Sequence, residues 1–273
     1  MNKVMIIGGS DSGGGAGIQA DLKTVTALGA FGTTVIAALT AQNTMGVQSV
    51  HAVPPGFVGE QIDSIMNDIG TDAVKTGMLL NEETVVVVAE HIKKYGLDNV
   101  VVDPVLYAKD GSALLGGDTA IKTLTSEIWP LALIVTPNIP EAEVLSGISI
   151  KQPAHVEEAA RELHELGARN VLIKGGHAPE DWPSRGKGVV EDLFYNGKDF
   201  RQLVSPRVDV GSVHGSGCTL ASAIAAGLAY RKSVEEAVLF AKEFLNEALR
   251  CSIKVGQGCN LLDPFRSVRK YSQ

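Results

Sequence analysis

Short apolar runs rich in β-branched residues alternate with amphipathic runs of helical period along nearly the whole chain. The apolar runs predict strands, and the amphipathic runs predict helices. The predicted strands are Val4–Ile7, Thr34–Leu39, Ala73–Lys75, Val100–Asp103, Leu133–Thr136, Val171–Lys174 and Val189–Tyr195. The predicted helices include Ile18–Leu28, Phe57–Asn67, Glu82–Tyr95, Val156–Leu166, Leu220–Tyr230 and Val234–Leu249. Strands that are apolar throughout are buried on both faces, so the chain is expected to be an α/β protein with a mostly parallel central sheet and helices on both faces.

One part of this sheet is expected to run antiparallel. The pair Asn196-Gly197 stands between Val189–Tyr195 and a further apolar run, Phe200–Leu203. An Asn-Gly pair between two strand-like runs is a hairpin signal, which predicts an antiparallel hairpin late in the sheet. No composition break or long linker interrupts the sequence, so residues 1–273 are expected to form a single domain.

Composition argues against several classes of partner. The net charge is −7 with no basic run, so neither nucleic acid nor an acidic membrane surface is expected as a partner. No apolar stretch approaches the ~20 residues of a membrane span, and the first residues read as a strand rather than as a signal peptide. The cytoplasm is therefore the expected compartment. The three cysteines and scattered histidines show no metal-ligand spacing, so neither disulfides nor structural zinc are expected.

Six predicted strand ends carry residues suited to chemistry. They are Gly8–Gly17, Gln42-Asn43, Gly77-Met78, Asp103-Pro104, Asn138–Glu141 and Gly175-Gly176. The carboxyl ends of parallel strands meet at one edge of the sheet, where such folds bind ligands, so a single site is predicted there. A carboxylate directly after an apolar strand is costly unless it is paired or used, which leaves Asp103 open to a structural or a functional role.

The glycine-rich segment Gly8–Gly17 does not match the common nucleotide-binding loops. No Gly-Lys-Ser/Thr follows it, so it is not a Walker A loop. It partly fits the dinucleotide fingerprint, but the span from Leu22 to Gly59 holds no Asp or Glu to bind a ribose. We expect the loop to close over a small organic substrate, with Asp11 accepting a hydrogen bond; a turn without a ligand is the alternative.

A second glycine-rich turn, His214–Thr219, directly precedes a predicted helix. Gly215, Ser216 and Gly217 leave backbone N–H groups unpaired at the helix start, and with the helix dipole these form an anion site. The same position is expected to lower the pKa of Cys218. A plain helix cap beside a small buried cysteine is the alternative.

Two further charged residues have both an ordinary and a functional interpretation. Glu141 lies in the first turn of a predicted helix, where it is either a routine N-terminal acid or a ligand for Mg²⁺ near nucleotide phosphates. Lys174 follows an apolar strand and precedes two glycines. It is either a surface lysine or a contact to a phosphate.

In combination, six segments resemble the ribokinase-like superfamily and, within it, the hydroxymethylpyrimidine/phosphomethylpyrimidine kinases of thiamine biosynthesis. The segments are residues 8–24, 41–47, 75–78, 103–105, 136–141 and 214–220. The resemblance implies a ribokinase-like fold and an ATP-dependent kinase that uses Mg²⁺. Its substrates would be 4-amino-5-hydroxymethyl-2-methylpyrimidine and then the monophosphate of that alcohol. Relatives are commonly homodimers.

The resemblance also implies a role for each matching residue. The substrate pocket would be lined by Gln42, Asp11, Ala16, Met78 and Val105, the nucleotide side by Asn138, Glu141, Lys174 and Gly176, and the catalytic centre by Gly215, Ser216, Gly217, Cys218 and Asp103. Glu141 would hold the Mg²⁺. Most superfamily relatives carry Asp where this chain has Cys218, whereas the pyrimidine kinases and some pyridoxal kinases carry Cys.

Two other functions compete with this interpretation. A pyridoxal or pyridoxine kinase of the same branch is the nearer one, and Gln42 favours the pyrimidine because such relatives often lack that glutamine. A catalytically silent nucleotide-binding regulator is the other. The presence of Asp11, Gln42, Glu141, Lys174 and Cys218 argues against it.

Overall fold

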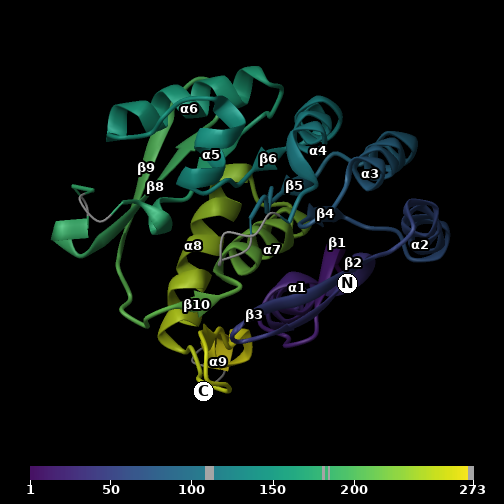
Figure 1. The fold of residues 1–273 in the computed structure, drawn as a ribbon, viewed down its shortest axis with the longest axis horizontal. Helices are drawn as coiled ribbons and strands as arrows, with labels where there is room; N and C mark the ends of the chain where they lie inside the picture. Colours follow the sequence, from purple (N-terminus) through teal and green to yellow (C-terminus); the bar gives the residue numbers. More distant parts are fainter. Residues whose placement is uncertain (108–113, 180–181, 184, 270–273) are drawn as a thin grey trace.

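The computed structural model describes residues 1–107, 114–179, 182–183 and 185–269 (Figure 1). In this part of the chain, nine strands form one sheet in the order β3-β2-β1-β4-β5-β6-β7-β8-β9. They are β1 (Lys3–Asp11), β2 (Phe31–Asn43), β3 (Gly46–Ala52), β4 (Ala73–Thr76), β5 (Val100–Val102), β6 (Ile134–Val135), β7 (Val171–Ile173), β8 (Val189–Tyr195) and β9 (Phe200–Pro206). Two short strands, β10 (Val213–His214) and β11 (Asn260–Leu261), pair with each other.

The α-helices connect most of these strands. They are α1 (Gly17–Ala27), α2 (Pro55–Asp68), α3 (Glu82–Tyr95), α4 (Gly117–Thr123), α5 (Ile139–Ser146), α6 (Pro153–Glu165), α7 (Ser216–Ala229), α8 (Val234–Arg250) and α9 (Pro264–Arg269). Within the described residues, none of them is long and apolar enough to cross a membrane.

The helices form two layers because successive strand residues point to opposite faces of the sheet. In β1, Val4 and Ile6 pack in one apolar core with α1, α7 and α8. Met5 and Ile7 pack in the other core with α2, α3, α5 and α6. Figure 1 shows these two groups on either side of the sheet. The predicted α/β architecture with both faces covered is confirmed.

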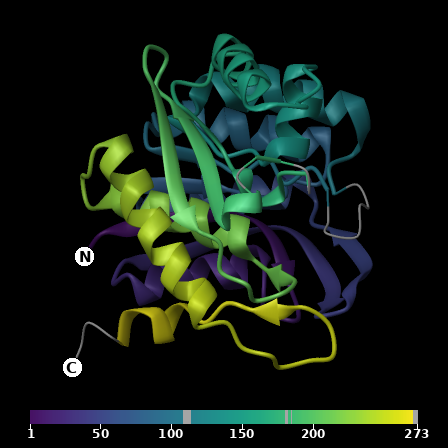
Figure 2. The same ribbon diagram turned by 90° about the vertical axis from the view of Figure 1, so that its left-hand side faces the viewer.

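The central strands, from β2 through β1 to β7, run parallel. Strand β8 pairs antiparallel with both β7 and β9, and the β8–β9 hairpin stands out in Figure 2. Its turn is closed by the Asn196 side chain, which accepts the N–H groups of Lys198 and Asp199. The late antiparallel hairpin is therefore confirmed.

A second antiparallel pair, β2 with β3, lies at the opposite edge of the sheet. Strand β3 was not predicted, because nearly all of it is exposed and no buried face imposes an alternating pattern on its sequence. Pairing with β3 extends β2 as far as Asn43. The expectation that Gln42 follows its strand is thus wrong, since Gln42 lies inside β2 and faces Val47 across the pair.

A buried ion pair joins the sheet to the helix layer that carries α1 and α7. Lys75 Nζ in β4 lies 2.8 Å from Asp21 Oδ2 in α1, and both side chains are about 1% exposed. Ser222 in α7 donates a hydrogen bond of 2.7 Å to the other oxygen of Asp21. Burial by itself would lower the pKa of Lys75, but the attraction of nearby acidic groups, Asp21 foremost, raises it, so Lys75 remains an ammonium.

Removing one partner of this pair is expected to leave an uncompensated charge in the core. Lys75→Met should lower the free energy of unfolding by about 3–5 kcal/mol in urea denaturation. Lys93→Met is the matched control because Lys93 pairs with Glu127 at 2.8 Å with both side chains 40–50% exposed, and it should cost less than about 1 kcal/mol. An equal loss in the free energy of unfolding for the two variants would contradict the interpretation of Lys75 as a buried, paired cation.

Candidate functional site

A cavity of about 940 Å³ lies at the carboxyl ends of the parallel strands. Every residue to which the family resemblance assigned a role lines this cavity. These residues are Asp11, Ala16, Gln42, Met78, Asp103, Val105, Asn138, Glu141, Lys174, Gly176 and Gly215–Cys218. The structure therefore brings together residues from both ends of the chain, while the individual roles that were predicted for them stay predictions.

Asp11 organises the glycine-rich loop that follows β1. It is 3% exposed, and its carboxylate accepts the N–H groups of Gly13, Gly15 and Ala16 at 2.7–2.9 Å. This arrangement satisfies three backbone donors of a tight loop and holds Ala16 at the start of α1. Much of the hydrogen-bonding capacity of Asp11 is thus used within the loop.

The two glycine-rich turns contact each other directly. Gly215 has φ +82°, and a Cβ atom at this residue would lie 2.0 Å from the carbonyl oxygen of Gly15. Glycine is required here for its left-handed conformation as well as for the close approach. The turn before α7 is therefore fixed against the loop after β1.

Helix α7 begins at Ser216 with Gly215 as its N-cap, and its first turn faces a cluster of charged side chains. A Cβ atom at Gly217 would lie 3.3 Å from Lys174 Nζ and 3.4 Å from Asp103 Oδ2. The unpaired N–H groups of a helix start and an ammonium group thus meet in one place. Such an arrangement favours an anion with spread negative charge.

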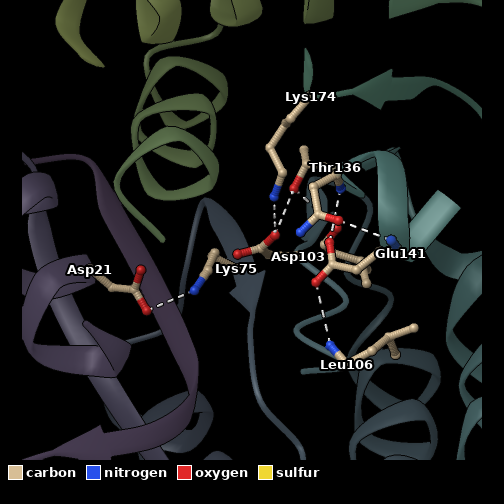
Figure 3. A network of polar contacts seen from close by, with 9 residues as sticks. Asp21, Lys75, Asp103, Leu106, Thr136, Glu141 and Lys174 are labelled. Carbon is tan, nitrogen blue, oxygen red and sulfur yellow. Dashed lines mark hydrogen bonds and ion pairs between the residues drawn. The ribbon is translucent and has the colours of Figure 1, made fainter. Parts of the chain in front are cut away.

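Asp103 and Lys174 form the centre of the charged cluster (Figure 3). Lys174 Nζ donates to Asp103 Oδ1 at 2.8 Å, and the Thr136 hydroxyl donates to the same oxygen at 3.3 Å. Burial alone would lower the pKa of Lys174, but Asp103 and Glu141 outweigh it and raise the pKa. Lys174 is thus a largely buried cation, with its side chain 13% exposed, and not the surface lysine of the alternative interpretation. Asp103 is both paired and in the site.

Glu141 completes this cluster from the first turn of α5. Glu141 and Asn138 form a capping box in which each side chain accepts the other's backbone N–H at 2.9 Å. The N–H of Leu106 also donates to Glu141, at 3.4 Å. Burial raises the pKa of Glu141, and the nearby Lys174 opposes that rise. Glu141 therefore does serve as an ordinary N-terminal acid of α5, which is one of its two interpretations from the sequence.

The chemistry of this corner fits Mg²⁺ that arrives with phosphates. Mg²⁺ keeps several waters and is held through one or two carboxylates together with substrate phosphates. Asp103 and Glu141 supply two neighbouring carboxylates, both at most 5% exposed. Among the described residues, no group of three or more His, Cys, Asp or Glu forms a cage for a metal ion. Glu141 as the Mg²⁺ ligand stays a prediction.

The expectation of a lowered pKa for Cys218 is wrong. Burial raises the pKa of this thiol to about 12, against the smaller opposing effects of Lys75 and a hydrogen bond from the Gly17 backbone. Desolvation of a thiolate outweighs the helix start here because Lys75, the nearby cation, is already paired with Asp21. The thiol is consequently neutral near pH 7.

The end of the cavity that lies at β2 is built around Gln42. Its side-chain oxygen accepts the Thr40 hydroxyl at 3.1 Å, and its Nε2 lies 3.0 Å from His214 Nε2. These two contacts fix which end of the amide points where. A held amide offers a donor and an acceptor side by side, which suits a heterocycle that carries both.

The apolar wall of this end is tightly packed and strained. Met78 is 8% exposed, and a Cβ atom at Gly9 would lie 2.3 Å from its terminal carbon, so the Met78 side chain packs directly against the backbone of β1. Val105 has φ +46°, which is unusual for a β-branched residue. Strain of this kind gathers at ligand sites, where the surrounding structure holds it.

Comparison with known proteins identifies the family. The model of the phosphomethylpyrimidine kinase family matches residues 11–263. The chain belongs to this family. The hydroxymethylpyrimidine/phosphomethylpyrimidine kinase of Bacillus subtilis is 43% identical over 256 residues, which cover 94% of this chain and 92% of that protein. A thiamine biosynthesis bifunctional protein of Geobacter sulfurreducens is 50% identical over 255 residues, and this chain spans about half of its length.

Solved structures show the same fold. The pyridoxal kinase of Bacillus subtilis in complex with ADP is 35% identical, with a TM-score of 0.87 and 99% of each chain covered. The phosphomethylpyrimidine kinase of Clostridium difficile 630 is 38% identical, with a TM-score of 0.79, and the match covers 91% of this chain and 100% of that one. The resemblance to ribokinase-like kinases is confirmed.

The structure also places in this cavity several residues to which the sequence analysis assigned no role. They are Asp21, Lys75, Arg185, Asp192, Arg207, His214 and Lys242. Lys75 and Asp192 had a detectable signal, since each is a charge inside an apolar strand and must be paired or used. Arg185 and Arg207 had no such signal, because their position at the cavity depends on how the β8–β9 hairpin folds.

The neutral thiol makes a testable prediction about alkylation. A pKa of about 12 leaves roughly one Cys218 thiol in 10⁴ ionised at pH 8, so iodoacetamide should modify it at least about a hundred-fold more slowly than a free cysteine peptide. Because rising pH ionises the thiol, the rate should increase about ten-fold per pH unit from 7 to 9. Site-resolved mass spectrometry separates Cys218 from the other cysteines. A rate that levels off near pH 8 would refute the raised pKa.

Proposed function

We propose that this member of the phosphomethylpyrimidine kinase family transfers a phosphoryl group from ATP to 4-amino-5-hydroxymethyl-2-methylpyrimidine and then to its monophosphate. The observation that carries the proposal is the meeting of the α7 start with Lys174 and Asp103 in the same cavity as the held amide of Gln42. The names of the similar kinases from Bacillus subtilis and Clostridium difficile support it.

The proposed mechanism rests on positioning and charge neutralisation, as is usual for phosphoryl transfer. Gln42 would orient the pyrimidine so that its hydroxymethyl group points toward the α7 start. The N–H groups of Gly215–Cys218 and the ammonium of Lys174 would hold the charge on the transferring group. When bound at Glu141 and Asp103, Mg²⁺ would neutralise charge on the phosphates of ATP.

The protonated state of Cys218 limits its role. A neutral thiol does not take a proton from an alcohol, so we propose that Cys218 shapes the anion site rather than acting as the base near neutral pH. Asn138 and Gly176 lie on the same side of the cavity as Lys174 and would border the nucleotide.

A pyridoxal kinase is the second candidate because solved pyridoxal kinases share this fold with TM-scores up to 0.87. Gln42 favours the pyrimidine, since its fixed amide complements a ring nitrogen next to an amino group. A silent nucleotide-binding regulator has no feature of this cavity in its favour, because the anion site and the paired Lys174 are intact.

We also propose that residues 1–273 form one domain that assembles as a homodimer. The outer edge of β3 has no neighbouring strand in the described sheet, and Leu39, Met45 and Val50 are exposed around it. An unpaired edge with exposed apolar side chains suits a second copy of the chain.

A coupled ADP-release assay tests the function. Hydroxymethylpyrimidine and its monophosphate should each stimulate ADP release, and pyridoxal should do so at least about ten-fold less well in kcat/KM. Gln42→Ala should reduce kcat/KM for the pyrimidines by about ten-fold or more because the buried ring edge loses its partners. Stimulation by pyridoxal alone would favour the second candidate, and stimulation by none would favour the regulator.

The Mg²⁺ site has a matched pair of test variants. Glu141→Gln keeps a capping box, which accepts Glu or Gln, but removes the carboxylate charge, so the Mg²⁺ concentration for half-maximal activity should rise about ten-fold or more. Glu236→Gln makes the same change in the capping box of α8, outside the cavity, and should leave that concentration unchanged. Excess EDTA should abolish turnover in every variant. An unchanged Mg²⁺ requirement in Glu141→Gln would exclude Glu141 as a ligand.

A further inference from the structure

Two arginines converge on the wall of the cavity that is formed by the β8–β9 hairpin. Arg185 begins the 3-10 turn Arg185–Lys187, and Arg207 directly follows β9. The backbone N–H of Arg207 donates to the carbonyl of Gly188 at 2.9 Å, and the N–H of Gly188 donates to the carbonyl of Arg185 at 3.1 Å. One short turn thus holds both residues, and both line the cavity.

Half of the nitrogens of these two guanidinium groups are buried without a hydrogen-bond partner among the described residues. Nε of Arg185 and both Nε and Nη2 of Arg207 are shielded from solvent and make no hydrogen bond to any described residue. A guanidinium cannot rotate its N–H groups toward another acceptor as a hydroxyl can, and it cannot lose its charge. Arginines elsewhere in the described chain do find carboxylates; examples are Arg161, Arg169, Arg201, Arg250 and Arg266.

The electrostatic surroundings of this pair also favour an anion. Burial and then the charge of Arg185 lower the pKa of Arg207, so the two cations destabilise each other. Asp192, an acid that lines the same cavity, is already paired. Its oxygens accept from Lys242 and from the N–H of Gly175 at 2.8 Å. No ion pair between an arginine of this wall and a described acid therefore involves Asp192, and both arginines face the cavity.

A third unpaired group adds to the same wall. Ser205 lies near the end of β9, two residues before Arg207. Its hydroxyl is buried without a hydrogen-bond partner, and the residue lines the cavity. A hydroxyl and two guanidinium forks are the donors that proteins use for phosphate oxygens.

We propose that Arg185, Arg207 and Ser205 form a second anion site that binds a phosphate group of the donor nucleotide. The assignment to the donor rests on the function proposed above. The assignment to the donor is based on the position of this wall in the cavity. Asp192 connects the wall to Gly175, which directly follows Lys174, whereas Gln42 lies on β2 near the other edge of the sheet. The phosphate of the pyrimidine monophosphate is the other source of the same chemistry, and the experiment separates the two.

Calorimetric titration of ADP and of the pyrimidine monophosphate tests the proposal with Arg185→Gln, Arg207→Gln and the double variant. Each single change should weaken ADP binding by about ten-fold or more, because a charged hydrogen-bond partner is lost, and should leave binding of the pyrimidine monophosphate unchanged. Arg169→Gln is the matched control. Its partner is Asp98 at 3.8 Å, both side chains are more than half exposed, and it lies outside the cavity.

Thermal unfolding without ligand distinguishes binding from a structural role. Removing one of two unpaired cations should leave the Tm unchanged or raise it, although ADP binding falls. A fall in both Tm and ADP affinity, or unchanged ADP affinity, would overturn the proposal. Loss of affinity for the monophosphate alone would overturn the assignment to the donor. ADP binds without a phosphoryl acceptor. Weaker ADP binding by the Arg207→Gln variant would therefore support the anion site even if no pyrimidine stimulated turnover.

Discussion

The buried contact between Lys75 and Asp21 is the interaction on which the site depends. It connects a central strand to α1, and Ser222 extends it to α7, so the two helices that begin at the glycine-rich turns are held to the same strand. The close contact of Gly215 with Gly15 requires the starts of α1 and α7 to lie side by side. A buried ion pair gives little net stability compared with apolar packing, but it tolerates few alternative arrangements. Its contribution here is to place two loops relative to each other.

The charges of the cavity are arranged by burial and pairing. Lys75 and Lys174 each lie against a carboxylate, which keeps both as cations in a region with little water. Cys218 lies near Lys75 but stays neutral, because burial disfavours its thiolate and the negative charges of Asp21 and Asp103 add to that effect. The cavity therefore offers fixed cations and backbone N–H groups to an anion without a reactive thiolate among them. Arg185 and Arg207 have buried nitrogens without a hydrogen-bond partner among the described residues, and they continue this positive character toward the β8–β9 edge of the sheet.

Much of the fold and the site could be predicted from the sequence because the signals were local. Apolar strands, the Asn196-Gly197 turn and the two glycine-rich turns each leave a pattern within about ten residues. The strand β3 left none, because it has no buried face, and the extension of β2 past Gln42 was missed with it. The pKa of Cys218 was predicted in the wrong direction for a related reason. The helix start is visible in sequence, whereas the desolvation that outweighs it comes from distant segments packed around the thiol.

The sequence alone determined the parallel core and many of the residues that line the cavity at the carboxyl ends of its strands, because these follow from strand period and short motifs. Tertiary structure alone decided how those residues are charged and partnered. It paired Asp103 with Lys174 and Lys75 with Asp21, used the carboxylate of Asp11 within its own loop, and left buried nitrogens of Arg185 and Arg207 without a hydrogen-bond partner among the described residues. The two ion pairs join residues more than fifty positions apart in the chain, and no local pattern records such contacts.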